Sequence, residues 1–542
     1  MKDVVIKLEK DPNNYNLNLD LGLWYLKEKN YEEAKKIFTK LVKIDDQRYE
    51  GFLNLSIILL QFGDSENSEL ILKKYLKKNN YNKEIISALC SIYYNNNDFI
   101  RLSTLVDKYI NIETNYLLFY FKSIISEKEN NIENQKEFLI KSINENKIFW
   151  LSYEKLLNLY ERTNKIDDFS YLISVAKKIF KNNPKLDYYF ALSLFRKNEI
   201  ELALKEITLN QLEKKFFEKL NPSYLINLYD LLSKIYVKQN KYKLSLDYSI
   251  KRNSISIKSE DNKQFNKEKL LDTIKTYKVF YHSLKKTNDI DNNNTLFHEN
   301  LVFLVGFPRS GTTLLDSILR SHSKTQVLEE KPYLIDIRHE YFKNNTLENF
   351  SNISKNDIIS LQKKYFSSFN YFDKNITIDK FPLNLIELGF IKKVFPRSKI
   401  ILVLRHPLDS ILSCVLTSFK INEAMANYEN LETAAYFYNE VFELFNIYKN
   451  SFNFSFYQIK YENIVENFYK EIKNLLYFLN LEYEDTVKNY HLTAKERDKI
   501  NTPSYHQVIR PIYKSSINRY KNYSETKKIK GQINKWINEF GY

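Results

Sequence analysis

The residues best suited to chemistry lie around two glycines, in a chain where glycine is rare. Only 8 of the 542 residues are glycine, yet Gly306 and Gly311 lie five positions apart in one short segment. Their pattern, G-x-x-x-x-G, follows the apolar run LVFLV and precedes Thr312, Thr313 and a stretch with helical apolar spacing. A strand, a glycine loop and a helix N-terminus present backbone N–H groups to a phosphate. We therefore predict a phosphate-binding loop.

The type and position of its positively charged residue distinguish this loop from an ATP-binding loop. The ATP-binding pattern needs lysine directly after the second glycine, where this sequence has Thr312. Arg309, inside the loop, supplies the positive charge instead. Such a loop suits a phosphate ester whose transferred group is not held by magnesium.

A second segment combines a strand end with a helical hydroxyl. The run KIILVL at 399–404 predicts a buried strand, Arg405 follows it directly, and Ser413 lies eight residues further on. An arginine at the C-terminal edge of a parallel strand and a hydroxyl on the next helix can bind one phosphate together. The sequence thus predicts two phosphate sites.

These two motifs carry a resemblance to a known family. VGFPRSGTT resembles the 5′-phosphosulfate loop of sulfotransferases that use 3′-phosphoadenosine 5′-phosphosulfate, and KIILVLRHPLDSILS resembles their 3′-phosphate site. The chain is most similar to tyrosylprotein sulfotransferases and to bacterial proteins that join tetratricopeptide repeats to a sulfotransferase domain. The resemblance implies that donor as co-substrate, and a nucleotide site formed by Arg309, Ser310, Gly311, Thr312, Thr313, Arg405, Ser413, Tyr461 and Arg510.

The same resemblance assigns the catalytic residues. LEEKP resembles the segment that carries the catalytic base in tyrosylprotein sulfotransferases, which implies Glu330 as the base in preference to Glu329. IDKFPLN and NTPSYHQVIRP are similar to segments that contact the reacting sulfate and the leaving phosphate. We therefore expect Lys380, Ser504 and Arg309 to stabilise the charge that develops during transfer.

Sulfuryl transfer of this kind requires positioning, a base and charge stabilisation, but no metal. The 7 histidines and 2 cysteines form no pattern of metal ligands, so we expect no metal site. His322, near the end of the helix after the glycine loop, is a competing candidate for the base.

The first half of the chain contains a repeat. Three sets of positions recur every 34 residues: Leu21, Leu55 and Leu89; Gly22, Ser56 and Cys90; and Phe38, Leu72 and Val106. The segment LDLGLWYLKEKNYEEAKKIFTKLVKID resembles a tetratricopeptide repeat. Stacked helical hairpins of this type predict a concave surface for a partner peptide or protein, or else a packing spacer for the second half.

Composition excludes several classes of protein. The net charge of +15 comes from lysines that are mixed with acidic residues along the whole chain, so we expect no nucleic-acid partner. Cys90 and Cys414 cannot form a disulfide framework, which favours a reducing, cytoplasmic location. No apolar run reaches the roughly 18 residues of a membrane span, and the N-terminus does not resemble a secretory signal.

Together these elements predict an α + α/β protein, with a tetratricopeptide-like helical solenoid followed by a P-loop-like, doubly wound parallel-sheet sulfotransferase domain. We place the solenoid at residues 1–255, a helical and polar linker at 256–298, and the sulfotransferase domain at 299–542. The expected acceptor is a hydroxyl on a peptide or protein tyrosine, a glycan or a small metabolite. Two alternatives are a repeat scaffold with an inactive nucleotide-binding domain, and an ATP-dependent kinase, which the missing loop lysine disfavours.

Overall fold

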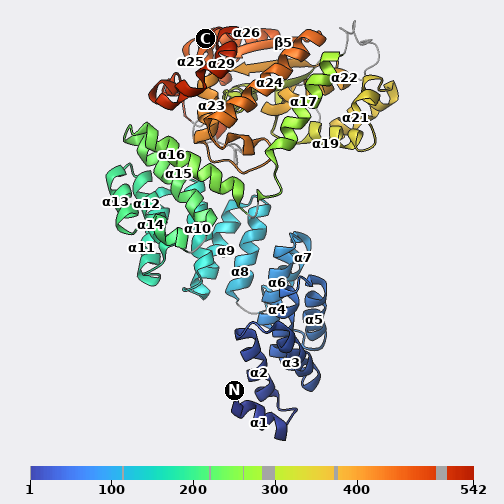
Figure 1. Ribbon diagram of the computed structural model, residues 1–542, viewed down its shortest axis with the longest axis vertical. Coiled ribbons are helices and arrows are strands. Elements are labelled where there is room, and N and C mark those ends of the chain that lie inside the picture. The colour runs from blue at the N-terminus through green and yellow to red at the C-terminus, as the bar shows by residue number, and fades with distance from the viewer. Residues whose placement is uncertain are drawn as a thin grey trace. The chain divides into compact units, whose positions relative to one another are not determined.

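The computed structural model describes residues 2–112, 115–218, 221–259, 262–283, 300–370, 376–495 and 510–542. Contacts group the chain into two compact units, Met1–Asn198 and Glu199–Tyr542. The first unit is helical, and the second combines helices with a sheet (Figure 1). No helix in these described ranges is long and apolar enough to cross a membrane.

The first unit is a series of helical hairpins. α2, α4 and α6 begin at Tyr15, Tyr49 and Lys83, so the predicted period of 34 residues is confirmed. Each helix contacts the next one along the chain, as neighbouring repeats of a solenoid do. The helices are α1 (Lys2–Lys10), α2 (Tyr15–Lys27), α3 (Tyr31–Ile44), α4 (Tyr49–Gln61), α5 (Ser65–Lys78), α6 (Lys83–Asn95), α7 (Phe99–Tyr109), α8 (Tyr116–Lys128), α9 (Ile132–Glu145), α10 (Trp150–Arg162), α11 (Ile166–Ile179) and α12 (Pro184–Arg196).

Small residues and left-handed turns shape these hairpins. A Cβ atom at Gly22 would lie 2.8 Å from Cζ of Phe38, so α2 and α3 can approach this closely because residue 22 is glycine. In the next hairpin, Oγ of Ser56 lies 2.9 Å from Oγ of Ser68. The turn inside each hairpin carries one residue with positive φ: Lys29, Gly63, Asn97, Asn130 and Asn164.

The second unit begins with further helices. These are α13 (Ile200–Leu209), α14 (Leu212–Glu218), α15 (Pro222–Lys238), α16 (Tyr242–Lys258) and α17 (Lys267–Ser283). α15 and α16 pack as a hairpin, and α17 packs on α24 (Leu431–Ser451) and contributes Ile274 and Tyr281 to the core. The contacts therefore group α13–α17 with the sheet, while the boundaries at 255 and 298 stay a prediction.

A parallel sheet forms the centre of the second unit. Its strands are β1 (Leu301–Gly306), β2 (Thr325–Glu329), β3 (Ile376–Lys380), β4 (Lys399–Leu404) and β5 (Phe456–Lys460), in the order β2-β3-β1-β4-β5. The chain leaves β1 towards β2 on one side and leaves β4 towards β5 on the other. β1 and β4 thus flank the topological switch point, where ligands bind at the carboxyl ends of parallel strands.

Helices cover both faces of the sheet, which confirms the doubly wound fold. Phe303 and Leu402 belong to a core shared with α17, α22, α23, α24 and α29, whereas Leu304 and Val403 face α18 and α26. The helices that follow β1 are α18 (Thr312–Arg320), α19 (Tyr333–Phe342), α20 (Leu347–Ser351), α21 (Lys355–Ser367), α22 (Leu388–Val394), α23 (Pro407–Leu416), α24, α25 (Tyr461–Glu466), α26 (Phe468–Phe478), α27 (Tyr490–Lys495) and α29 (Lys527–Glu539). Short 3₁₀ helices lie between them: η3 (Pro382–Glu387), η4 (Met425–Tyr428), η5 (Asp485–Asn489), η6 (Arg519–Asn522) and η7 (Ser524–Thr526).

Candidate functional site

The glycine loop connects β1 to α18 at the switch point. A Cβ atom at Gly306 would lie 2.6 Å from the carbonyl oxygen of Val403 on β4, and one at Gly311 would lie 2.7 Å from Cδ2 of Tyr461. Gly311 also has φ of +106°, a conformation that glycine adopts readily. No side chain among the described residues caps the N-terminus of α18, so its first N–H groups are available to an anion.

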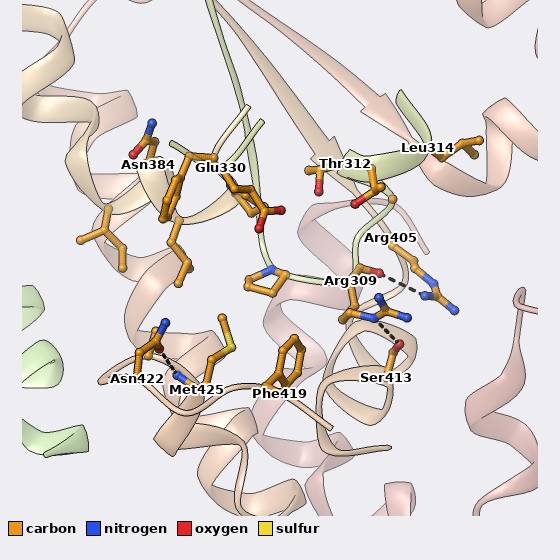
Figure 2. A pocket seen from close by; sticks show the side chains of 18 of the residues that line it. Arg309, Thr312, Leu314, Glu330, Asn384, Arg405, Ser413, Phe419, Asn422 and Met425 are labelled. Carbon is orange, nitrogen blue, oxygen red and sulfur yellow. Dashed lines mark hydrogen bonds between the residues drawn. The ribbon is translucent and has the colours of Figure 1, made fainter. Parts of the chain in front are cut away.

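The structure brings together the predicted cations and hydroxyl. Nε of Arg309 donates to Oγ of Ser413 on α23 over 3.1 Å, and Nη1 of Arg405 donates to the carbonyl oxygen of Arg309 over 3.1 Å (Figure 2). The Arg405 guanidinium also lies 5.1 Å from the centre of the Tyr461 ring. Burial lowers the pKa of Arg309, and the nearby charge of Arg405 lowers it further. Two guanidinium groups so close together favour an anionic ligand between them.

A carboxylate and a lysine meet at the ends of β2 and β3. Register pairs Glu329 with Lys380, and the N–H of Glu330 donates to the carbonyl oxygen of Lys380 over 2.8 Å. This pairing brings Nζ of Lys380 within 2.7 Å of Oε1 of Glu330. The Glu330 backbone has φ of +48°, an uncommon value for a residue with a side chain, which directs its carboxylate into the cavity shown in Figure 2.

Lys380 has two further carboxylates around it. Nζ of Lys380 lies 3.7 Å from Oδ2 of Asp316 and 3.7 Å from Oε1 of Glu329. Lys380 and Asp316 are both fully buried. Asp316 comes from α18, so the helix after the glycine loop also helps to fix the lysine. The sequence analysis missed this residue, although an aspartate in the otherwise apolar face of TTLLDSIL is a signal that could have found it.

One cavity of about 660 Å³ is lined by Glu330 and by both arginines, whereas the fully buried Lys380 lies behind Glu330 and is not part of the lining. In Figure 2, Thr312, Arg309, Arg405 and Ser413 lie at one end, and Glu330 lies between them and the other end. The predicted residues that line the cavity are Arg309, Gly311, Thr312, Thr313, Glu330, Arg405, Ser413 and Tyr461. Residues near the C-terminus that the sequence analysis did not single out also line it: Tyr513, Ser516 and Arg519.

The other predicted residues lie elsewhere. Ser310 is buried within the glycine loop, and Arg510 is exposed and is not part of the cavity lining. Ser504 lies outside the described residues. His322 is buried, and its ring nitrogens contact the backbone oxygen of Glu482 and the backbone N–H of Lys324, so its side chain does not line the cavity.

The end of the cavity opposite the arginines is mostly apolar. Its apolar lining comes from α17 and the segment before it, from α19, from η3 and the residue before it, and from the chain after α23: Phe265, Leu270, Ile335, Phe381, Pro382, Leu383, Ile386, Phe419, Ala424 and Met425. Nε of Arg338 lies 3.5 Å from Oε1 of Glu387 there. The polar and charged residues that these segments add to the lining are Arg338, His339, Asn384, Glu387, Lys420, Asn422 and Glu423. Nothing in the sequence patterns identified this end, because its residues come from four separate segments.

Comparison with known proteins finds one family match in the helical region and another in the region that contains the sheet. Residues 302–485 match a family described as the sulfotransferase family, and residues 64–220 match the family of anaphase promoting complex subunit 8 / Cdc23.

Three curated relatives match parts of the chain. An uncharacterised protein of Aquifex aeolicus is 28% identical over 236 residues, which cover 41% of this chain and 31% of that protein. The TPR repeat-containing protein YsoA of Bacillus subtilis is 35% identical over 60 residues, which cover 11% and 18%. Protein-tyrosine sulfotransferase 1 of Danio rerio is 23% identical over 238 residues, which cover 41% and 65%. The chain thus spans less than two thirds of each of these relatives.

Solved structures match the helical repeats. PilF of Pseudomonas aeruginosa is 15% identical, with coverage of 38% of this chain and 94% of PilF and a TM-score of 0.34. The Cut9–Hcn1 assembly is 13% identical, with coverage of 38% and 41% and a TM-score of 0.33. Taken with the two-part fold and the glycine loop at the switch point, the matched families show that this chain joins tetratricopeptide-like repeats to a sulfotransferase-family domain.

Proposed function

We propose that this protein is a sulfotransferase that moves a sulfuryl group from 3′-phosphoadenosine 5′-phosphosulfate to a hydroxyl acceptor. The observation that carries the proposal is a single cavity with two arginines and a helix N-terminus at one end and the Glu330 carboxylate facing its middle. Binding of a doubly phosphorylated nucleotide needs the first group of residues, and deprotonation of an acceptor needs the second.

The donor end fits the two phosphate groups of the nucleotide. We propose that the glycine loop, with Arg309, Ser310, Gly311, Thr312 and Thr313, binds the 5′-phosphosulfate. Arg405 and Ser413 then bind the 3′-phosphate, and Tyr461 packs nearby. In support of this, the Arg309–Ser413 hydrogen bond of 3.1 Å joins the two groups of residues in one cluster. Ser504 keeps the role predicted for it from the sequence, whereas Arg510, which does not line the cavity, remains a prediction from the family resemblance alone.

The reaction needs a proton acceptor and charge stabilisation. Glu330 removes the proton from the acceptor hydroxyl as the oxygen attacks sulfur in line, and the S–O bond to the leaving phosphate breaks with its electron pair remaining on that phosphate. Arg309, Lys380 and Ser504 stabilise the charge on the sulfuryl and bridging oxygens. Lys380 suits this role because it is held at the edge of the sheet, 2.7 Å from Glu330.

The acceptor is a hydroxyl on a peptide or protein tyrosine or on a glycan. The apolar end of the cavity, with Phe381, Phe419 and Met425, supports an aromatic acceptor, because a phenol ring can pack against these side chains. A tyrosine is also the acceptor suggested by the name of the Danio rerio relative. The repeats would bind the peptide or a partner protein, and a cytoplasmic location fits two free, buried cysteines.

The test is transfer of labelled sulfur. The full-length protein, the labelled donor and a tyrosine-containing peptide are incubated together and analysed by mass spectrometry, with p-nitrophenol and a hexose oligomer as alternative acceptors. Sulfated phenolic product supports the proposal. If the protein binds 3′-phosphoadenosine 5′-phosphate but forms no sulfated product with any acceptor, the scaffold with an inactive nucleotide domain is favoured instead.

A further inference from the structure

Two polar side chains of α16 are buried against the end of α23. Arg252 is 1% exposed and Asn253 is 8% exposed. Nη2 of Arg252 donates to the carbonyl oxygen of Val415 over 2.9 Å, and Nη1 donates to that of Leu416 over 3.2 Å. Nδ2 of Asn253 donates to Val415 over 2.9 Å as well, and to the carbonyl oxygen of Tyr428 over 2.9 Å.

The two side chains are themselves fixed. Nη1 of Arg252 also contacts Oδ1 of Asp230 on α15 at 2.7 Å, and Nη2 donates to Oδ1 of Asn253 over 2.8 Å. Burial would raise the pKa of Asp230, but the charges of Lys234 and Arg252 hold that pKa below its usual range. Asp230 therefore remains charged, and the guanidinium has a fixed orientation towards α23.

The carbonyl groups that these side chains bind belong to the last residues of a helix. Val415 and Leu416 end α23, where carbonyl oxygens have no N–H partner within the helix. A cation at this position satisfies them and interacts favourably with the helix dipole. α16 thus caps α23, and the two helices lie side by side in Figure 1.

The chain that leaves this cap forms the wall of the apolar end of the cavity. Phe419, Asn422 and Met425 lie on it and line the cavity. Phe419 and Met425 also line a second, small cavity of about 10 Å³, together with Arg252 and Asn253. The polar pair therefore lies directly behind the wall that faces the acceptor, with almost no empty volume between them.

Other contacts hold the part of α23 that precedes Val415. Oδ1 of Asp409 accepts a hydrogen bond from the N–H of Tyr520 over 2.8 Å, and Sγ of Cys414 contacts the carbonyl oxygen of Pro308 at 3.3 Å. Ser413 at the donor end is therefore less dependent on α16 than the residues that follow Leu416.

We infer that Arg252 and Asn253 are positioning residues for acceptor binding: they fix the segment 415–429, and through it Phe419 and Met425, in the conformation that the acceptor requires. They touch neither substrate, so their effect reaches the reaction only through this segment. The inference rests on the proposed function for its kinetic consequence, but its structural consequence can be measured without any substrate.

The test uses the full-length chain with Arg252→Lys and Asn253→Asp. Asn253→Asp keeps the size of the side chain and its acceptor for Arg252, but replaces the donor to Val415 and Tyr428 with an oxygen. Asp247→Asn, an exposed position on the same helix, is the matched control. Hydrogen exchange of the free protein is followed by mass spectrometry, and initial rates are measured with a phenolic acceptor.

We expect exchange in segment 415–429 to become about tenfold faster in Asn253→Asp, since a lost hydrogen bond makes local opening easier. KM for the acceptor should rise by about tenfold, while calorimetric affinity for 3′-phosphoadenosine 5′-phosphate stays within about twofold. Arg252→Lys should raise the exchange rate and KM by less than Asn253→Asp does, because lysine keeps the charge but lacks the planar guanidinium group.

Unchanged exchange in this segment, faster exchange spread over the whole of 199–542, or an equal loss of nucleotide affinity would each overturn the inference. Absence of turnover in the wild-type protein would contradict the proposed function instead, and the exchange measurement would still decide the role of Arg252 and Asn253.

Discussion

The two compact units differ in the polar groups that they bury. Among the described residues of Met1–Asn198, every buried polar side chain is neutral, as in the serine pair Ser56 and Ser68. In Glu199–Tyr542 the buried polar side chains include Asp316, Lys380 and Arg405. Burial of charge is costly unless each charge has partners. The repeat unit avoids this cost, whereas the unit with the sheet buries charged side chains, several of them at the site proposed above.

The first prediction concerns Lys380, the buried cation among these side chains. In Lys380→Met, three carboxylates that now lie within 3.7 Å of Nζ lose their cation. Turnover should fall by at least about 100-fold, and loss of one partner of a buried pair should cost about 3–5 kcal/mol of unfolding free energy. Rates and urea denaturation measure the two effects. Lys331→Met, an exposed neighbour, is the control, and an active, equally stable Lys380→Met would show that the cluster is not needed.

The second prediction concerns the donor end. Arg405→Ala should weaken binding of 3′-phosphoadenosine 5′-phosphate by about 100-fold, and Ser413→Ala by about tenfold, since charged hydrogen bonds are lost. Calorimetry measures the affinity of the wild type and of both variants for this nucleotide and for AMP, which lacks the 3′-phosphate. The wild type should prefer the first nucleotide strongly, and the exposed Lys528→Ala should bind like the wild type. Equal wild-type affinity for both nucleotides is the result that argues against the donor assignment.

The third prediction uses a buried carboxyl next to the site. Burial raises the pKa of Asp379 to about 7, and Tyr365 Oη donates to its Oδ2 over 2.7 Å. A folded-state pKa above the unfolded value means that the folded protein binds more protons, so this group makes the protein less stable as pH rises towards 7. Asp379→Asn does not titrate. The denaturation midpoint of Asp379→Asn should therefore increase relative to that of the wild type between pH 5 and about pH 7. Above about pH 7 the difference between the two midpoints should stay constant.

Titration of His406 does not obscure this comparison. Burial lowers the pKa of His406 to about 4, so its contribution increases with pH, but it is present in both proteins and cancels in the difference. Parallel midpoints over the whole pH range would contradict a raised pKa at Asp379.

The fourth prediction has the smallest effect on the site. Gly22→Ala places a Cβ atom 2.8 Å from the Phe38 ring, and such overpacking costs about 1–3 kcal/mol. Thermal unfolding monitored in the repeat unit should begin at lower temperature. Nucleotide affinity should remain that of the wild type, because Gly22 belongs to the other compact unit. A change in nucleotide affinity would show that the two units are coupled energetically.

The repeats were predictable because their contacts are local. The interval of 34 residues places equivalent positions of successive hairpins in contact, so periodicity alone predicts both the helices and the small residues between them. The glycine loop was predictable for a similar reason, since Gly306, Arg309 and Gly311 act within a few residues of one another.

The remainder of the site depends on register between distant segments. The contact between Glu330 and Lys380 needs the pairing of β2 with β3, and Asp316 joins them from α18. A local sequence pattern does not indicate which side chains of three separate elements come together at one edge of the sheet. The apolar end of the cavity and the cap formed by Arg252 escaped prediction for the same reason.

The most direct test of Glu330 as the catalytic base is the turnover rate of Glu330→Gln, with the nucleotide affinity of the variant measured separately. The substitution keeps the shape of the side chain and removes its basicity. We predict that turnover falls by about 100-fold or more, while affinity for 3′-phosphoadenosine 5′-phosphate stays within about twofold. Glu329→Gln should have a much smaller effect on turnover. A Glu330→Gln variant that retains most of its rate, with His322→Ala inactive but folded, would contradict Glu330 as the base.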